Sequence, residues 1–277
     1  MSGIVLSELA IYPVKSLAQI QLQTSYLHRF GLHHDRRWML VDHQGIFITQ
    51  RQVPQMCLIQ ADLIYSNLTP LDPTVSGIQL QTPGMTALEV SIPSPHKITK
   101  ITVWNDTCDA HDCGDEAANW LSHFLQRDCR LVYFPDDAVR AVDPAYAKPE
   151  DQTAFSDGFP LLLISQASLD DLNSRLEQAV TMNRFRPNLV VSGCEPYAED
   201  RWKKISIGGI TFRVVKPCSR CSIPTIDPHT AQKDPQVIKT LTSYRRRDNN
   251  IYFGQNVIAD TEGQIDTGMT VTVLEYN

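Results

Sequence analysis

Two cysteines with C-x-x-C spacing, Cys218 and Cys221, stand in the segment VVKPCSRCSIPTIDP at residues 214–228. A structural zinc site needs four ligands, usually two such pairs or one pair with two histidines. The sequence has no second pair, and the nearest candidate, CDAHDC at 108–113, has an irregular spacing. Zinc is therefore one open interpretation of the pair, and not the favoured one.

A redox-active dithiol is a second interpretation of the C-x-x-C pair, and two ordinary reduced cysteines beside a strand end are a third. A thioredoxin-like dithiol lies at the beginning of a helix, but Pro224 and Pro228 after Cys221 exclude an immediate helix. Lys216 and Arg220 flank the cysteines. Because cations favour the thiolate form of a cysteine, this setting suits a soft metal.

Three short segments place basic and polar side chains at the ends of predicted strands. YPVKSL contains Lys15 and Ser16, HHDRRW contains Arg36 and Arg37, and FRPN contains Arg186 and Asn188. Ligands of barrel-like folds often bind at such strand ends, and the planar fork of arginine suits phosphate. The residues alone therefore predict a small anionic ligand, together with a thiolate-bound metal that they do not identify.

Short hydrophobic runs separated by turn-rich pieces predict a chain made mostly of β-strands. The predicted strands are 4–14, 20–27, 37–42, 45–49, 56–66, 77–82, 87–93, 98–104, 129–134, 161–165, 185–193, 203–208, 210–216 and 269–276. Amphipathic spacing predicts helices at 114–128, 165–178 and 235–247. Many strands with few helices indicate a mainly β fold with some α (α+β), of the barrel or sandwich type. The polar stretch 135–159 is the expected domain seam or functional loop.

Composition limits the classes of function. A net charge of −6 and a pI near 5.7 argue against nucleic-acid binding, and no G-x-G-x-x-G or P-loop pattern is present. There is no signal-peptide pattern and no run of 18 apolar residues, so we expect no membrane association. Seven cysteines without an export signal predict reduced thiols, and hence a soluble cytoplasmic protein.

Eight segments, in order along the chain, resemble the MOSC family, whose members are related to the C-terminal domain of molybdenum-cofactor sulfurase. They are IYPVKSL, DRRWMLVD, FITQRQVPQM, SDGFPLLLISQASLDDLNSRL, FRPNLVVSG, YAEDRW, KPCSRC and FGQN. Within this family the sequence resembles bacterial YcbX-type proteins and mitochondrial amidoxime-reducing components. This resemblance implies an N-terminal β-barrel-like domain at 1–125 and a MOSC β-barrel domain with a few flanking helices at 126–277.

The resemblance implies a molybdenum cofactor, a molybdopterin whose metal is bound by the second cysteine of the pair, Cys221. Residues that match cofactor contacts in the family are Lys15, Ser16, Arg36, Arg186, Asn188, Ser219 and Arg220. The SDGFP loop matches another cofactor-lining segment, but it has Gly158 and Phe159 where relatives can have small hydroxylated residues. Asp157 and Asp227 are hypothetical proton relays near the metal, with a structural capping role as the alternative.

The function implied by the resemblance is the reduction of N-hydroxylated compounds such as hydroxylamines, amidoximes and N-hydroxylated base analogues. The sequence contains no C-x4-C-x2-C pattern of a plant-type ferredoxin, and we expect no membrane anchor of the kind found in the mitochondrial relatives. We therefore expect electrons from a separate flavin- or iron–sulfur-containing donor protein. The alternative is a carrier that delivers the cofactor, or sulfur on Cys221. We do not expect a complete sulfurase, because no pyridoxal-phosphate domain fits in this length, and pyridoxal phosphate binding is implied only at the level of the family.

Overall fold

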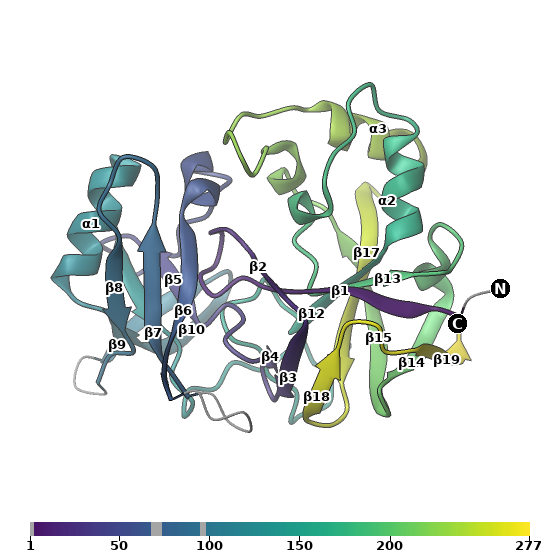
Figure 1. Cartoon of the computed structure of the whole chain (residues 1–277), viewed down its shortest axis with the longest axis horizontal. Helices are drawn as coiled ribbons and strands as arrows, with labels where there is room; N and C mark the ends of the chain where they lie inside the picture. Colours follow the sequence, from purple (N-terminus) through teal and green to yellow (C-terminus); the bar gives the residue numbers. More distant parts are fainter. Residues whose placement is uncertain (1–2, 68–73, 95–97) are drawn as a thin grey trace.

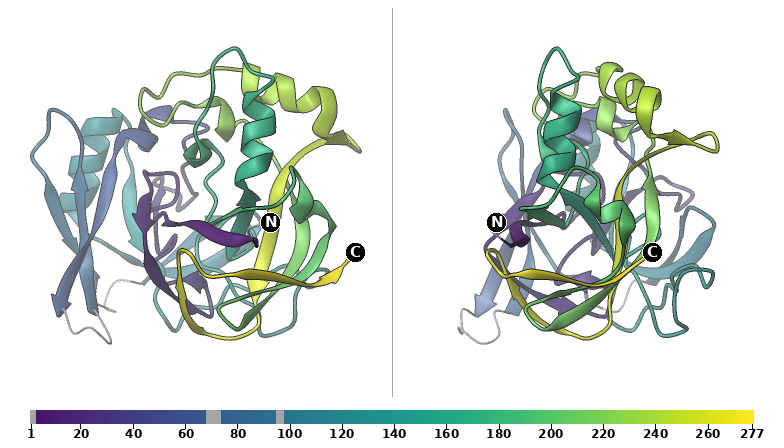
Figure 2. Two further views of the ribbon diagram at one scale, coloured as in Figure 1. Left: turned by 45° about the vertical axis from the view of Figure 1, so that its right-hand side comes forward. Right: turned by 90° about the vertical axis from the view of Figure 1, so that its right-hand side faces the viewer.

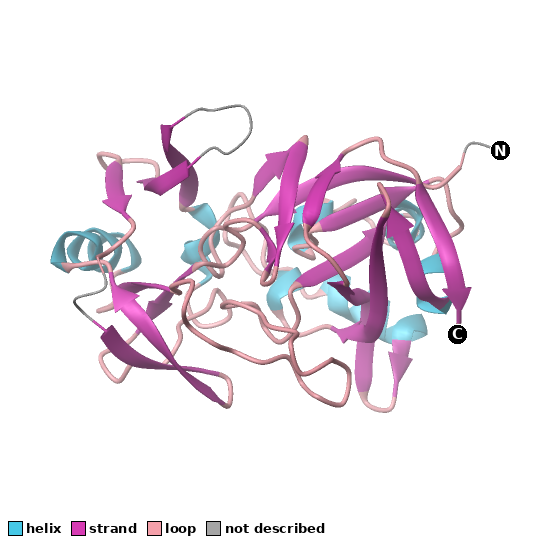
Figure 3. Cartoon of the chain, turned by 90° about the horizontal axis from the view of Figure 1, so that it is seen from below, coloured by secondary structure: helices cyan, strands magenta, loops and turns pink. Residues whose placement is uncertain are grey.

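Short strands make up most of the chain in its computed structural model, which describes residues 3–67, 74–94 and 98–277. The largest sheet has nine strands, with the order β19-β14-β15-β17-β12-β13-β1-β2 and with β16 paired to β17. These strands are β1 (Val5–Ile11), β2 (Ile20–Leu22), β12 (Leu161–Ser165), β13 (Leu189–Ser192), β14 (Trp202–Ile207), β15 (Ile210–Ser219), β16 (Arg246–Arg247), β17 (Asn250–Ala259) and β19 (Val271–Tyr276). The predicted mainly β fold is confirmed, and strands dominate the view in Figure 3.

Among the described residues, three smaller sheets accompany the large one. One has the order β5-β11-β10-β9, another β18-β3-β4, and the third β6-β7-β8. Their strands are β3 (Thr24–His28), β4 (Gly31–Leu32), β5 (Trp38–Val41), β6 (Gln60–Asn67), β7 (Thr74–Gln81), β8 (Leu88–Ser91), β9 (Ile98–Val103), β10 (Asp106–Asp112), β11 (Arg130–Tyr133) and β18 (Gly263–Asp266). Strands β5–β10 gather on the left of Figure 1, apart from the large sheet on the right.

The first strand of the chain belongs to the large sheet. β1 pairs with β13, about 180 residues away in the sequence, and β3 pairs with β18 near the C-terminus. The N-terminal segment therefore joins the part of the fold built mainly by the second half of the chain, as Figure 1 shows. The division into domains at residue 125 stays a prediction.

The three predicted helices are confirmed, with shorter bounds: α1 (Asp115–Leu125), α2 (Gln166–Asn173) and α3 (Gln236–Arg245). Ser165 caps α2, because its hydroxyl accepts a hydrogen bond from the Ser168 amide at 3.1 Å. Helices α2 and α3 lie side by side over the large sheet in both views of Figure 2. Leu172 and Leu241 from these helices pack there against Phe253 of β17. Among the described residues, no helix has the length and hydropathy needed to cross a bilayer.

The predicted strand at 45–49 is wrong. Ile46 and Phe47 make only isolated bridges, because Asp42 holds this segment in a turn. Its carboxylate accepts hydrogen bonds from the amides of Gln44 and Ile46 at 2.9 and 3.0 Å, and Gly45 has a φ of +76°. An Asx turn of this kind competes with strand pairing.

Candidate functional site

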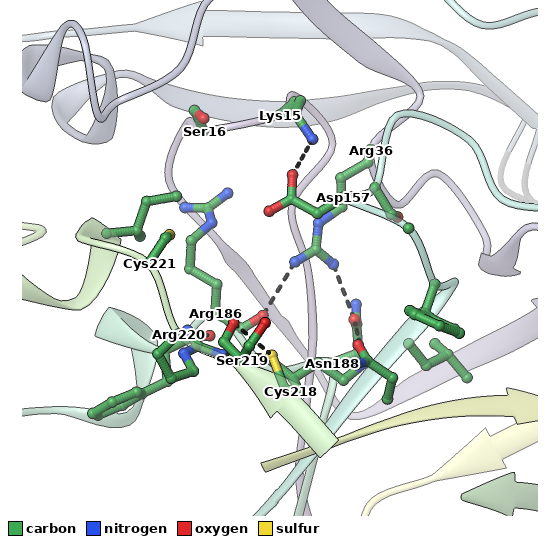
Figure 4. A pocket seen from close by; sticks show the side chains of 18 of the residues that line it. Lys15, Ser16, Arg36, Asp157, Arg186, Asn188, Cys218, Ser219, Arg220 and Cys221 are labelled. Carbon is green, nitrogen blue, oxygen red and sulfur yellow. Dashed lines mark hydrogen bonds and ion pairs between the residues drawn. The ribbon is translucent and has the colours of Figure 1, made fainter. Parts of the chain in front are cut away.

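One cavity collects nearly all of the residues that the sequence singled out, and Figure 4 shows their side chains around it. The predicted residues that line it are Lys15, Ser16, Arg36, Asp157, Gly158, Phe159, Arg186, Asn188, Ser219, Arg220 and Cys221. They come from the loop after β1, the approach to β5, the loop before β12, the approach to β13 and the end of β15. Segments far apart in sequence thus meet beside the large sheet.

Lys15 and Asp157 form an ion pair in this cavity. The ammonium Nζ donates to Asp157 Oδ1 at 2.5 Å and to the Phe155 carbonyl at 2.7 Å, and Lys15 is only 5 % exposed. Burial lowers the pKa of Lys15 to about 8 even though Asp157 acts to raise it. Burial would raise the pKa of Asp157, but the charge and hydrogen bond of Lys15 hold it well below its usual range. The pair is therefore charged at neutral pH.

Arg36 is held by a buried carboxylate that the sequence analysis did not select. Its Nη1 donates to Asp35 Oδ2 at 2.5 Å and to Asn188 Oδ1 at 3.0 Å. Asp35 is 1 % exposed and also accepts from the Tyr12 amide at 2.8 Å. Burial raises the pKa of Asp35 above its usual value, although the charge and hydrogen bond of Arg36 act to lower it. The guanidinium is thereby fixed in one orientation, and Asp35 acts as its positioning residue.

Arg186 is the second guanidinium held in place by its surroundings. Nη1 donates to the Leu17 carbonyl at 2.7 Å, and the guanidinium lies 4.1 Å from the centroid of the Tyr12 ring. The Arg36 guanidinium lies 4.2 Å from the same centroid. Burial lowers the pKa of Arg186 to about 10, with Tyr12 acting to raise it and Arg36 to lower it. Two cations that repel each other are thus kept together by a shared aromatic ring.

The backbone is strained at three residues that line the cavity. Ser16, Arg36 and Arg186 have φ values of +72°, +48° and +57°, in the left-handed region that residues other than glycine rarely adopt. Such positions cost about 1 kcal/mol or more each and are kept only where the surrounding structure imposes them. Three of them around one cavity suggest that their side-chain directions matter for function.

The C-x-x-C segment lies at the end of β15 and is the more open part of the cavity. Arg220 Nη1 lies 3.2 Å from Cys218 Sγ, and Nη2 donates to the Phe185 carbonyl at 2.8 Å. Cys221 is exposed and Cys218 half-buried, and neither is in a disulfide. Within the described residues, no three His, Cys, Asp or Glu side chains cluster to hold a metal. The two cysteines therefore occupy different environments.

The side-chain amide of Asn188 forms its hydrogen bonds with other groups of the protein. Its Oδ1 accepts from the Leu162 amide at 3.2 Å as well as from Arg36, and its Nδ2 donates to the Ala10 carbonyl at 3.1 Å. The side chain is 1 % exposed. Both ends of the amide are thus engaged, so Asn188 ties β1 to β12 and orients Arg36.

Asp227 is the predicted site residue that the structure does not bring to this cavity. Its Oδ1 accepts hydrogen bonds from the amides of His229 and Thr230 at 2.9 and 3.0 Å, and Oδ2 pairs with Arg184 at 2.7 Å. These contacts are those of a turn cap, which was the alternative reading of this residue. Its part in proton relay has no support in the geometry.

The loop at 154–157 is organised by Arg140, which the sequence analysis also missed. Arg140 is 4 % exposed and donates to the carbonyls of Ala154 and Ser156 at 2.7 and 2.6 Å, and its Nε pairs with Asp106 at 2.7 Å. Arg140 lies in the polar stretch 135–159. Because this stretch has no hydrophobic periodicity, the sequence does not indicate that the arginine is buried.

The polar groups of the cavity fit an anionic ligand. Four cations, Lys15, Arg36, Arg186 and Arg220, and one carboxylate, Asp157, line it. Within the described part of the chain, three buried polar atoms of its lining residues have no hydrogen-bond partner: Arg186 Nη2, Arg220 Nε and Ser156 Oγ. Buried polar groups are normally satisfied, so three unpaired donors beside the cavity point to a polar partner that is not part of the chain. An exposed thiol in the same cavity adds a soft ligand, so this set of donors suits a phosphorylated, metal-bearing pterin.

Comparison with known proteins agrees with this donor set. Residues 3–128 match the model of the MOSC N-terminal beta barrel domain, and residues 150–272 match that of the MOSC domain. Mitochondrial amidoxime-reducing component 1 of Mus musculus is 35% identical over 285 residues, which are 97% of this chain and 82% of that protein. The Homo sapiens protein of the same name is also 35% identical, over 97% of this chain and 82% of its own. Molybdenum cofactor sulfurase of Bos taurus is 32% identical over 90% of this chain, but only 30% of the sulfurase is matched.

Proposed function

Because this chain belongs to the MOSC family, we propose that it is a molybdenum-cofactor-dependent oxidoreductase that reduces N-hydroxylated compounds. The substrates of this class are hydroxylamines, amidoximes and N-hydroxylated base analogues. The observation that carries the proposal is that exposed Cys221 lines the same cavity as four cations, two of which, Arg186 and Arg220, have a donor without a partner among the described residues. A thiolate and a phosphate-binding site in one cavity are what the cofactor requires.

The residues divide into two groups toward the cofactor. Cys221 would be the metal ligand, with Ser219 and Arg220 beside it. Lys15, Ser16, Arg36 and Arg186 would hold the phosphate and pterin, with Asn188 orienting Arg36. The loop containing Gly158 and Phe159 would line the site through its backbone. When bound, the molybdenum centre supplies the two-electron chemistry, and the protein supplies binding, orientation and protons.

The reaction consumes protons that the chain must deliver. It is R–NH–OH + 2 H⁺ + 2 e⁻ → R–NH2 + H2O, in which the N–O bond breaks and the oxygen leaves as water. Lys15, whose pKa is lowered to about 8, is poised to give up a proton near neutral pH. The ionised Asp157 that accepts its hydrogen bond holds the ammonium in place. We assign the proton-handling role to this pair and leave Asp227 out of it.

The electrons must come from outside the cavity. We propose a separate flavin- or iron–sulfur-containing donor protein that reaches the exposed side of the site at Cys221. A cytoplasmic location is also proposed, in keeping with seven cysteines that are all unpaired.

A second function is favoured by a different observation. The chain is similar to part of a molybdenum cofactor sulfurase, and an exposed cysteine could bear a transferable sulfur or a cofactor for delivery. In this alternative the protein would be a carrier with the same cavity, and it would turn over no substrate.

One preparation separates the two functions. The chain is purified from a host that makes the cofactor, its molybdenum and pterin contents are measured, and reduction of hydroxylamine and of an amidoxime is assayed with an artificial reductant. Bound cofactor with reduction supports the enzyme, whereas bound cofactor without reduction supports the carrier. Protein that is free of cofactor despite a competent host would contradict both.

A further inference from the structure

Trp104 has a backbone conformation that a bulky side chain rarely adopts. The register of β9 and β10 pairs Val103 with Asp106, so Trp104 and Asn105 form the two-residue turn between these strands. The φ of Trp104 is +56°, a conformation for which hairpin turns normally use glycine, asparagine or aspartate. A bulky residue with such a φ is an outlier that points to a role beyond the turn.

The indole of Trp104 reaches from this turn to the loop that lines the cavity. Its Nε1 donates to Asp157 Oδ1 at 3.3 Å. The ring centroid lies 5.2 Å from that of Phe47, and the Arg51 guanidinium lies 4.5 Å from it. Trp104 is nevertheless 44 % exposed. Phe47 and Arg51 hold the ring, and its exposed part stands beside Asp157, which lines the cavity, although Trp104 itself is not a lining residue.

Asp157 presents a free acceptor beside that surface. Its Oδ1 accepts from both Lys15 and Trp104, whereas no group in the described ranges donates to Oδ2. The side chain of Asp157 is 57 % exposed, in contrast to 6 % for that of Lys15. One carboxylate oxygen is thus used to fix the group, and the other is open to a ligand.

We propose that Trp104 and Oδ2 of Asp157 form a recognition wall for planar N-hydroxylated substrates that carry a second nitrogen, such as amidoximes and N-hydroxyamino heterocycles. This inference rests on the proposed function and names the preferred substrates within it. The conjugated plane stacks on the indole, and the amino N–H of the N–C–N unit donates to the carboxylate. Hydroxylamine itself has neither feature, so the wall discriminates between the two kinds of substrate.

The test compares two substrates in the cofactor-loaded protein. The ratio of kcat/KM for benzamidoxime to kcat/KM for hydroxylamine should fall about tenfold in Trp104→Asn, because a stacking surface is lost. Trp104→Phe keeps an aromatic ring without the N–H and should retain most of the ratio. Tyr65→Asn removes a comparably exposed aromatic, 42 % exposed, from β6 outside the cavity and should leave the ratio as it is.

A binding measurement keeps this inference separate from the proposed function. The dissociation constant of benzamidine, the reaction product, should rise about tenfold in Trp104→Asn and little in Trp104→Phe, whether or not the protein reduces anything. A ratio and a dissociation constant both within twofold of wild type in Trp104→Asn would overturn the wall. Equal losses in Trp104→Phe and Trp104→Asn would also overturn it, since the indole N–H would then act only by positioning Asp157. Benzamidine binding that depends on Trp104, in a protein that reduces neither compound, would support the wall and refute the oxidoreductase.

Discussion

Two sides of the cavity are built differently. The cationic side is defined as Lys15, Ser16, Arg36, Arg186 and Asn188. Its side chains are buried or half-buried, and their polar groups are largely paired within the protein. The open side consists of 157–159 and 218–221, where Asp157, Ser219 and Cys221 are exposed. Lys15, Ser16 and Asn188, by contrast, are at most 5 % exposed.

The difference suggests a division of labour. On the cationic side, the backbone is strained and the charges of Arg36 and Arg186 repel each other, yet the side chains are held in fixed directions. A permanent binding site for an anion requires charges fixed in this way. On the open side, the Cys221 thiol and the Oδ2 oxygen of Asp157 are less closely packed and can reach a ligand. Substitutions on the cationic side should therefore affect stability and cofactor binding together, and those on the open side should affect metal binding and chemistry with little change in stability.

The largest effect is expected on the open side, in Cys221→Ser. Loss of the proposed metal ligand should reduce activity by more than the roughly 10–100-fold that loss of an outer-shell partner costs. The free energy of unfolding should change by less than about 0.5 kcal/mol, because Cys221 is exposed. Activity assays with molybdenum analysis and thermal unfolding measure both quantities.

Cys218→Ser is the matched control, since Cys218 stands three residues away and contacts Arg220. It should retain cofactor and part of the activity. Equal and complete losses in both variants would show that the cysteines act as a pair, and the distinction drawn between them would fail.

The next largest effect is expected on the cationic side, in Asp35→Ala. The substitution leaves the Arg36 guanidinium without its buried partner, which typically costs about 3 kcal/mol or more, and removes the acceptor for the Tyr12 amide. Cofactor retention should fall with stability. Denaturant unfolding and pterin analysis provide the measurements.

The neighbouring pair of Arg37 and Asp136 supplies the control. Its carboxylate is 76 % exposed, against 0 % for that of Asp35. Asp136→Ala should therefore cost less than about 1 kcal/mol. If Asp136→Ala and Asp35→Ala lowered the free energy of unfolding equally, burial would not explain how strongly the side chains of the cationic side are held in place.

A moderate effect is expected from pH, through Lys15. Because its pKa is lowered to about 8 by burial, Lys15 is charged below that pH and loses its proton as the pH rises through it. The affinity of cofactor-free protein for sulfate, whose own charge is constant in this range, should fall up to about tenfold between pH 7 and pH 9. Titration calorimetry gives the dissociation constants. In Lys15→Arg the decline should disappear from this interval, and an unchanged decline would assign it to another group.

The sequence indicated most of the charged residues that line the cavity, because each lies in a short polar segment at a strand end or in a segment that resembles the family, but Arg37 and Asp227 do not line it. The sequence did not predict the groups that hold the lining residues. Asp35 stands beside Arg36 in HHDRRW, but its burial depends on β1, and Arg140 contacts carbonyls of a loop that has no periodicity. Such supporting residues are recognised by their partners in space, which local pattern does not reveal.

Strand β17 shows the same limit in the fold. It lies at the centre of the large sheet between β15 and β12, yet it was not among the predicted strands. Its segment includes Gly254, with a φ of +82°, and Gln255, a buried polar residue. Gln255 is satisfied by Asp200 at 2.7 Å, 55 residues earlier in the chain. A glycine and a buried amide lower the local strand propensity of this segment. Its tertiary partners nevertheless hold it as a central strand.

The smallest effect is expected on the open side, in Gly158→Ser. A Cβ at Gly158 would meet no atom within 4 Å, whereas one at Gly31, whose φ is +104°, would lie 2.8 Å from the carbonyl oxygen of Pro160 in the same loop. Gly158→Ser should therefore change the free energy of unfolding by less than about 0.5 kcal/mol, and Gly31→Ala should lower it by roughly 1–3 kcal/mol. Denaturant unfolding compares the two. If Gly158→Ser were as destabilising as Gly31→Ala, the loop would be held as firmly as the cationic side, and the open side would be limited to the C-x-x-C segment.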